Sequence, residues 1–199
     1  MIRESKTLPR RLLRLKDYDY AQVGAYFVTI CSANREFLFG EIIQGEMILN
    51  QAGRIVQEEW LKTTALRAYV KLDQFVVMPN HFHGILIISR DDEGTARCAP
   101  TERQFGKMAP DSLSSTIRGF KAGVSKSINL FRNTLGAPVW QRGFYEHVIR
   151  NDASLNRIQE YILTNPLRWE LDRENPRRCG EDEFDHWLGQ LKTRPNQPL

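Results

Sequence analysis

Residues 69–88 contain the feature that most narrows the possible folds: an apolar run, a tight turn and a second apolar run that starts with His-Phe-His. The turn is Pro79-Asn80, because proline fixes φ and asparagine tolerates tight turns. The apolar, β-branched runs on both sides predict the two strands of a β-hairpin. Side chains two apart on a strand point to the same face, so His81 and His83 converge while Phe82 points to the other side.

Two neutral imidazoles on one rigid face form half of a metal site. His-x-His pairs also arise by chance on protein surfaces, so the surface interpretation stays open beside the metal one. Two observations favour the metal site. The chain has four histidines in all, and His81 and His83 stand at the start of a predicted strand.

The composition is ordinary for a soluble globular protein, with 41% hydrophobic and 26% charged residues among 199. No apolar run approaches the ~20 residues that span a bilayer, and the basic N-terminus is not followed by the apolar stretch of a secretory signal. Three cysteines, Cys31, Cys98 and Cys179, are widely spaced and fit no cysteine-based zinc pattern. We therefore expect a reducing, cytoplasmic setting without a membrane partner.

The order of predicted elements indicates the fold class. We interpret residues 1–20 as a basic N-terminal arm, 21–172 as one domain and 173–199 as a polar C-terminal tail. Within the domain we expect a strand at 25–31, a hairpin at 37–49, a helix at 51–66 capped by Asn50, the central hairpin, a mobile loop at 89–110, a helix from Asp111 or Ser112 to 131, and a helix capped by Asp152. This order predicts an α+β fold, an antiparallel sheet with helices packed on one face.

The basic residues predict a polyanionic partner, although the net charge of +4 is modest and a solvated surface could carry the same charges. They gather in three places. Single-stranded nucleic acid suits such clusters where aromatic side chains lie between the cations, although core aromatics would give the same pattern. The candidates are Arg10, Arg11, Arg14 and Lys16 in the arm, Arg118, Lys121 and Arg132 as an outward stripe on the second long helix, and Arg142, Tyr145 and Arg150 in the segment 140–150.

Tyr161 and Asn165 are four residues apart on the helix that begins near Asp152, so they are neighbours on one side of it. Pro166 ends that helix directly after Asn165. A rigid element thus presents a tyrosine hydroxyl and an amide oxygen together. A half-buried packing role for the tyrosine remains the alternative.

Taken in order, four motifs resemble the REP-associated tyrosine transposases, which belong to the HUH single-strand nucleases and are related to single-tyrosine insertion-sequence transposases. The motifs are Pro79-Asn80-His81-Phe82-His83-Gly84, Trp140-Gln141-Arg142, Tyr145-Glu146-His147 and Tyr161-Ile162-Leu163-Thr164-Asn165-Pro166. The His-x-His motif is weakly specific alone, and the combination is far more specific. The loop 89–110 departs from the shortest members of the family.

The resemblance implies a ferredoxin-like sheet, with His81, His83 and Asn165 as ligands of Mg²⁺ or Mn²⁺ and Tyr161 as the nucleophile. The implied substrate is single-stranded DNA at hairpins of repetitive extragenic palindromes, in a nucleoid-associated protein that is a monomer or a homodimer. Cleavage would give a covalent 5′-phosphotyrosine intermediate able to rejoin strands. Tyr145 is a rival nucleophile by residue type, but it lies outside the helix motif.

Two other functions stay open from the sequence. A binding module of the same fold would recognise hairpin nucleic acid without cutting it, and would need the cations and aromatics but not the metal ligands. A metal-dependent hydrolase would use the histidine pair to activate water, and that class usually has additional His, Asp or Glu ligands. A hydrolase leaves no protein–DNA adduct, so the products separate the possibilities.

Overall fold

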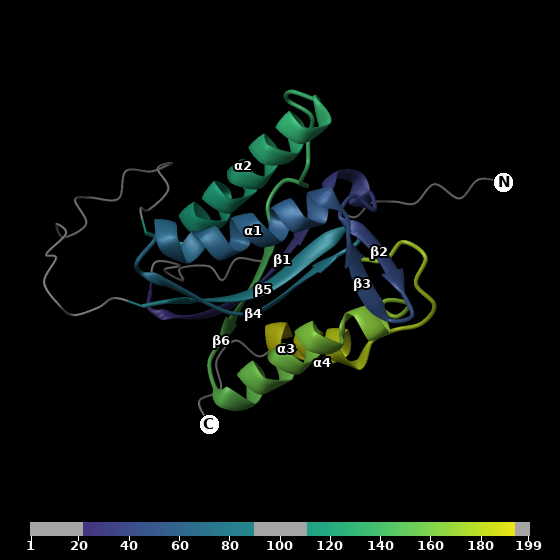
Figure 1. The fold of residues 1–199 in the computed structure, drawn as a ribbon. Helices are drawn as coiled ribbons and strands as arrows, with labels where there is room; N and C mark the ends of the chain where they lie inside the picture. The colour runs from purple at the N-terminus through teal and green to yellow at the C-terminus, as the bar shows by residue number, and fades with distance from the viewer. Residues whose placement is uncertain (1–21, 90–110, 194–199) are drawn as a thin grey trace, which may run out of the picture.

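A four-stranded antiparallel sheet forms the centre of the computed structural model, which describes residues 22–89 and 111–193 (Figure 1). Its strands lie in the order β4 (Val70–Met78), β5 (His81–Ile88), β1 (Gly24–Cys31) and β6 (Tyr145–Ile149). Helix α1 (Gln51–Leu66) leads into β4, and α2 (Leu113–Arg132) leads into β6. The order β-α-β-β-α-β is that of ferredoxin-like folds, so the predicted fold class is confirmed.

The two faces of the sheet carry different helices (Figure 1). Tyr26 and Val28 of β1 belong to the core under α1 and α2, which is the helical layer that the sequence predicted. Phe27, between them, and Ile85 of β5 point the other way, because side chains alternate along a strand. That second face is also apolar, and α3 (Asp152–Thr164) and α4 (Glu183–Thr193) cover it. The candidate site lies on this second face.

The capping residues in the sequence predicted where most of the helices begin. Asn50 caps α1, and Ser112 caps α2 through a capping box with Ser115. Two details differ from the prediction. Helix α3 is capped by Asn151, one residue before Asp152, and the side hairpin is made of β2 (Gly40–Ile43) and β3 (Glu46–Leu49). Phe37–Phe39 is not a strand, because the fully buried Phe39 instead bonds through its N–H to the Pro79 carbonyl.

Several predicted segments lie outside the described residues, namely the basic arm at 1–20 and nearly all of the loop at 89–110. Two short 3-10 helices, η1 (Ala33–Arg35) and η2 (Pro166–Arg168), complete the described elements. None of the helices in residues 22–89 and 111–193 combines the length and apolarity needed to cross a membrane.

The start of α1 packs directly against the chain before β2, at Gly53. A Cβ atom built on Gly53 would overlap the backbone carbonyl of Phe39. A Cβ on Gly123 of α2 would meet only the carboxylate end of the Glu59 side chain, which can move. Helix propensity alone favours alanine over glycine at both positions.

We therefore expect Gly53→Ala to destabilise the protein by about 1–3 kcal/mol, as overpacking does, in spite of its better helix propensity. Gly123→Ala should be neutral or stabilising by up to about 1 kcal/mol. Urea unfolding followed by circular dichroism measures both values. A Gly53→Ala variant as stable as the parent would contradict the close packing of α1 on the Phe39 carbonyl.

Candidate active site

His81 and His83 share the face of β5 that α3 and α4 cover, as the alternation predicted. They lie opposite Cys31 and Thr29 of β1, in the middle of the sheet. Both side chains are buried, and their Nε2 atoms are 3.0 Å apart. The pair is therefore an interior feature, and the alternative of two chance surface histidines is wrong.

Hydrogen bonds to the other ring nitrogens orient both imidazoles. The side-chain N–H of Asn80 donates to the Glu174 carbonyl at 2.7 Å, which leaves its Oδ1 to accept from His81 Nδ1 at 2.8 Å. Thr29 Oγ1 lies 2.9 Å from His83 Nδ1. Burial lowers the pKa of His81 to about 4, against the attraction of Asp172. A neutral His81 with its proton on Nδ1 directs the Nε2 lone pair towards His83 and Asp172.

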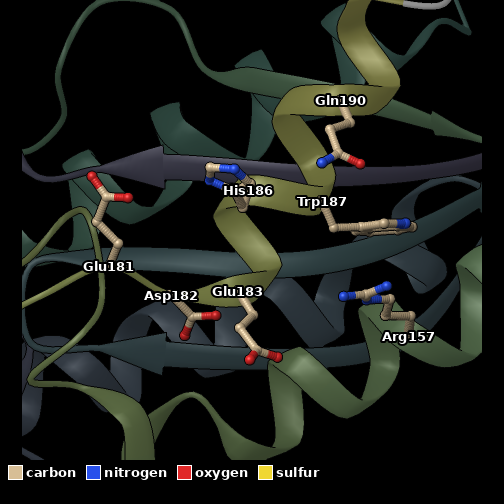
Figure 2. A pocket seen from close by; sticks show the side chains of 7 residues that line it. All are labelled: Arg157, Glu181, Asp182, Glu183, His186, Trp187 and Gln190. Atoms are coloured by element: carbon tan, nitrogen blue, oxygen red, sulfur yellow. The ribbon is translucent and has the colours of Figure 1, made fainter.

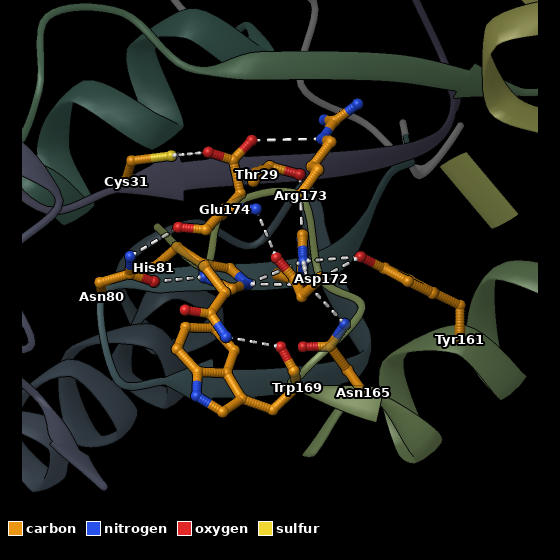
Figure 3. A network of polar contacts seen from close by, with 12 residues as sticks. Thr29, Cys31, Asn80, His81, Tyr161, Asn165, Trp169, Asp172, Arg173 and Glu174 are labelled. Atoms are coloured by element: carbon orange, nitrogen blue, oxygen red, sulfur yellow. Dashed lines mark hydrogen bonds and ion pairs between the residues drawn. The ribbon is translucent and has the colours of Figure 1, made fainter. Parts of the chain in front are cut away.

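Asp172 is the site residue that the sequence did not reveal. Its Oδ2 lies 3.7 Å from His81 Nε2 and 3.9 Å from His83 Nε2, and Figure 3 shows it at the centre of the polar network. The carboxylate accepts hydrogen bonds from Asn165 Nδ2 at 2.9 Å and from the Glu174 backbone N–H. Burial raises the pKa of Asp172, but the facing histidines and these hydrogen bonds outweigh it and hold the pKa well below its usual range. Asp172 is therefore ionised.

Tyr161 and Asn165 reach the same point from the end of α3, as their spacing predicted. The Tyr161 hydroxyl lies 3.3 Å from His83 Nε2 and donates to Asp172 Oδ2 at 3.2 Å. Its ring is 3% exposed and stacks on Phe184 of α4, with 3.7 Å between ring centroids. Burial and the neighbouring Asp172 charge raise the pKa of Tyr161 well above its ordinary value. The hydroxyl is therefore protonated and needs an acceptor for its proton.

The donor atoms at this point fit a divalent cation. His81, His83 and Asp172 offer two imidazole nitrogens and a carboxylate oxygen, all within 4.8 Å of one another. Asn165 Oδ1 is buried and has no hydrogen-bond partner among the described residues, which makes it a free acceptor beside them. Oxygen ligands suit Mg²⁺ and Mn²⁺, whereas imidazole favours transition metals, so the mixed set fits Mn²⁺ better than Mg²⁺.

The predicted DNA-binding residues are not gathered in one place. Arg118 and Arg132 are exposed on α2, across the sheet from the histidine pair, and Arg142 and Arg150 are exposed on either side of β6. The four candidates of the arm, Arg10, Arg11, Arg14 and Lys16, lie outside the described residues.

Lys121 and Tyr145 differ from the other predicted DNA contacts. The Lys121 ammonium donates to the carbonyls of Gln141 and Gly143, at 2.7 and 2.8 Å, and burial lowers its pKa to about 8. Lys121 thus ties α2 to the chain before β6 and does not belong to an outward stripe. Tyr145 lies opposite Thr29, on the same face as the histidines, with the Arg173 guanidinium 5.2 Å from its ring.

Two surface pockets flank α4. One, of about 410 Å³, lies beside α4 and is lined by Arg157, Trp187 and the acidic residues 181–183, among others, with none of the candidate site residues (Figure 2). The other, of about 460 Å³, runs along α3 and includes Tyr161, Glu160 and Phe184 in its lining. The second pocket gives the Tyr161 side of the site a surface opening.

Comparisons with known proteins find relatives in sequence and in structure. No family model matches the chain. An uncharacterized protein of Haemophilus influenzae is 41% identical over 168 residues, which are 82% of this chain and 92% of that protein. A second protein of this organism, provisionally described as a REP-associated tyrosine transposase, is 30% identical over 93 residues. That match spans 46% of this chain and about half, 47%, of the relative.

Among solved structures, the chain resembles a REP-associated tyrosine transposase bound to a REP hairpin. It superimposes with a TM-score of 0.54 at 22% identity, over 78% of this chain and 74% of that one. At this identity the likeness establishes a shared fold. It agrees with the β-α-β-β-α-β order of the sheet and its first two helices.

Proposed function

We propose that this chain acts as a REP-associated tyrosine transposase, which cleaves single-stranded DNA at REP-type hairpins and becomes joined to the cut strand through Tyr161. The observation that carries this proposal is the meeting of Tyr161 with His83 and Asp172, three buried side chains from separate elements. Together they place a hydroxyl nucleophile within hydrogen-bond distance of a carboxylate that can accept its proton.

We further propose that His81, His83 and Asp172 hold a divalent cation, with the free Oδ1 of Asn165 beside them. A bound divalent ion would supply the positive charge that a phosphodiester needs when it is attacked. The chain's own contribution is orientation. Asn80 and Thr29 fix the two imidazoles, and Asp172 fixes the Asn165 amide.

In the proposed step, the Tyr161 oxygen bonds to phosphorus and the bond from phosphorus to the 3′ oxygen of the strand breaks. The hydroxyl proton passes along the existing hydrogen bond to Asp172 and from there to water, and the leaving 3′ oxygen takes up a proton from water. The products are a 5′-phosphotyrosine and a free 3′ hydroxyl. The phosphotyrosine keeps the energy of the broken bond, so the reverse step can rejoin a strand.

We propose that the DNA contacts Tyr145 on β6 and the residues just before and after this strand. The basic arm at residues 1–20 is proposed as a further contact. Tyr145 shares the face of the histidines, with Arg142 and Arg150 exposed at the two ends of the strand. Arg118 and Arg132 lie on the other face, so they would contact DNA away from the cleaved phosphate.

One observation favours a second function. His81, His83 and Asp172 together form the set of two histidines and a carboxylate that a metal-dependent hydrolase could use to activate water. Both functions are tested by incubating the protein with single-stranded hairpin oligonucleotides and Mn²⁺, followed by a denaturing gel. The transposase reaction gives a shortened strand and an SDS-resistant protein–DNA band. Cleavage without that band would support the hydrolase, and binding without cleavage would support a binding module.

The role of Asp172 gives a separate prediction. Asp172→Asn keeps the shape of the side chain but removes the charge and the proton acceptor, so we expect cleavage of the hairpin oligonucleotide to fall about 10²–10⁴-fold. Asp73→Asn is the matched control, because Asp73 accepts hydrogen bonds from Gln159 away from the site. Single-turnover rates measure the effect. A rate for Asp172→Asn within a factor of three of the parent would exclude this role.

A further inference from the structure

Phe37, Trp169 and Arg177 meet beside the candidate active site, although they come from three separate segments. The Phe37 and Trp169 ring centroids are 5.7 Å apart at an interplanar angle of 66°. The Arg177 guanidinium lies over the Phe37 ring, 5.5 Å from its centroid. We call these three residues the aromatic shelf.

The shelf is open to solvent. Phe37 is 42% exposed, Trp169 is half-buried and Arg177 is exposed. Arg177 forms no ion pair with any carboxylate of the described residues, so its charge remains available to a ligand. An arginine over a ring, next to a second ring, presents flat surfaces and a positive charge together.

Trp169 connects the shelf to the reaction centre. It lies between Asn165 and Asp172 in the chain, and its backbone carbonyl accepts a hydrogen bond from Asn175. Its ring stacks near the His81 ring, with 6.0 Å between centroids and an angle of 27°, and Figure 3 shows it extending away from Asp172. Stacked bases lie about 3.4 Å apart, so the Trp169 ring is within about two stacking steps of the His81 ring.

The other exposed arginine–aromatic pair lacks these properties. Arg157 lies over Trp187 at 4.7 Å, but Glu181, Asp182 and Glu183 line the same pocket (Figure 2). The exposed Glu181 and Glu183 would repel a phosphate backbone, whereas Asp182 is buried and paired with Arg168. The charge around each pair therefore distinguishes the shelf from the pocket at α4.

We propose that the aromatic shelf binds an unpaired base of the DNA strand, next to the phosphate that is cleaved. Aromatic rings and guanidinium planes stack on any base, and Arg177 can pair with the adjoining phosphate. The shelf would hold the strand on the His81 side of the site while Tyr161 attacks from α3. This inference rests on the proposed function for its ligand, but the binding can be measured without any chemistry.

The test uses a Tyr161→Phe background and EDTA, so that neither cleavage nor metal contributes. The probe is a hairpin oligonucleotide with a single-stranded flank, in which 2-aminopurine replaces each flank base in turn. We expect the fluorescence at one position to be quenched on binding, and Trp169→Ala to abolish that quenching and weaken binding about tenfold. Trp169→Phe should restore both, because it keeps a ring at that place.

Two further variants guard against misfolding and general effects. Arg177→Ala changes an exposed side chain whose guanidinium lies over the Phe37 ring, and should weaken binding without altering the circular dichroism spectrum. Phe131→Ala is the control, since Phe131 is 61% exposed at the end of α2, across the sheet. The shelf is excluded if Trp169→Ala and Arg177→Ala bind and quench like the Phe131→Ala control. If the probe is quenched as expected but the parent protein never cleaves DNA, the aromatic shelf is supported and only the proposed function is contradicted.

Discussion

Tyr161→Phe should eliminate the covalent protein–DNA adduct and reduce strand cleavage by about 10³-fold or more, because it removes the oxygen that bonds to phosphorus. The substitution keeps the ring, so its stacking on Phe184 and the position of α4 are preserved. Fold, metal affinity and hairpin binding should therefore stay close to those of the parent. A gel in SDS, with a labelled oligonucleotide, measures the adduct.

Tyr145→Phe is the matched control for this result. Tyr145 lies on the same face of the sheet, packed edge to face on Phe27 with 6.4 Å between ring centroids. Its loss of a hydroxyl should leave cleavage intact, with at most weaker DNA binding. The assignment of the nucleophile would be wrong if the Tyr161 variant kept the adduct while the Tyr145 variant lost it.

Replacing both His81 and His83 by alanine should abolish cleavage while leaving hairpin binding largely intact, since the two side chains are buried and are not the main phosphate contacts. The loss should again be about 10³-fold or more, as expected when charge neutralisation at a phosphate is removed. Calorimetric titration with Mn²⁺ should show binding to the parent and none to the double variant. Circular dichroism checks that the emptied interior still folds.

His186→Ala is the control for the histidine pair, because His186 is exposed on α4 and lies outside the network. It should match the parent in Mn²⁺ affinity and in cleavage. Undiminished cleavage by the His81 and His83 double variant would remove the metal site from the mechanism. If that variant lost Mn²⁺ binding but still cleaved normally, the bound metal would take no part in the reaction.

The parts of the site that the sequence predicted are those set by local geometry. His81 and His83 converge because a strand alternates its faces, and Tyr161 and Asn165 are neighbours because a helix turns every 3.6 residues. Pro79-Asn80 and Pro166 marked the ends of those elements. Each of these inferences depends on only a few consecutive residues, and the tertiary contacts of this fold agree with all of them.

Asp172 could not be found in this way. It follows η2 in an irregular segment, where no periodicity relates its side chain to Tyr161 or to β5. Its role depends on a hydrogen bond from Asn165, seven residues earlier, and on contacts with histidines some ninety positions away. The seven-residue spacing from Asn165 to Asp172 indicates a contact between the two side chains only when the fold is already known.

Charge patterns were the least reliable guide. Lys121 has the spacing of an outward helical residue, but its ammonium bonds to the carbonyls of Gln141 and Gly143, because a long side chain can bend towards nearby acceptors. The second helical layer was also missed, since one face of a strand gives the same alternation whether or not a helix covers the other. Phe27 and Ile85 are apolar side chains on that other face, and residues of α3 and α4 bury them.

The most direct test of the central claim is to locate the DNA on the protein. Trypsin cuts after arginine, so Tyr161 falls in the peptide 158–168 and Tyr145 in the peptide 143–150, each with a single tyrosine. After reaction with a hairpin oligonucleotide and Mn²⁺, nuclease trimming and mass spectrometry should find a nucleotide phosphate on the peptide 158–168, attached to Tyr161. A nucleotide on the peptide 143–150, or cleaved DNA with no modified peptide, would contradict the account.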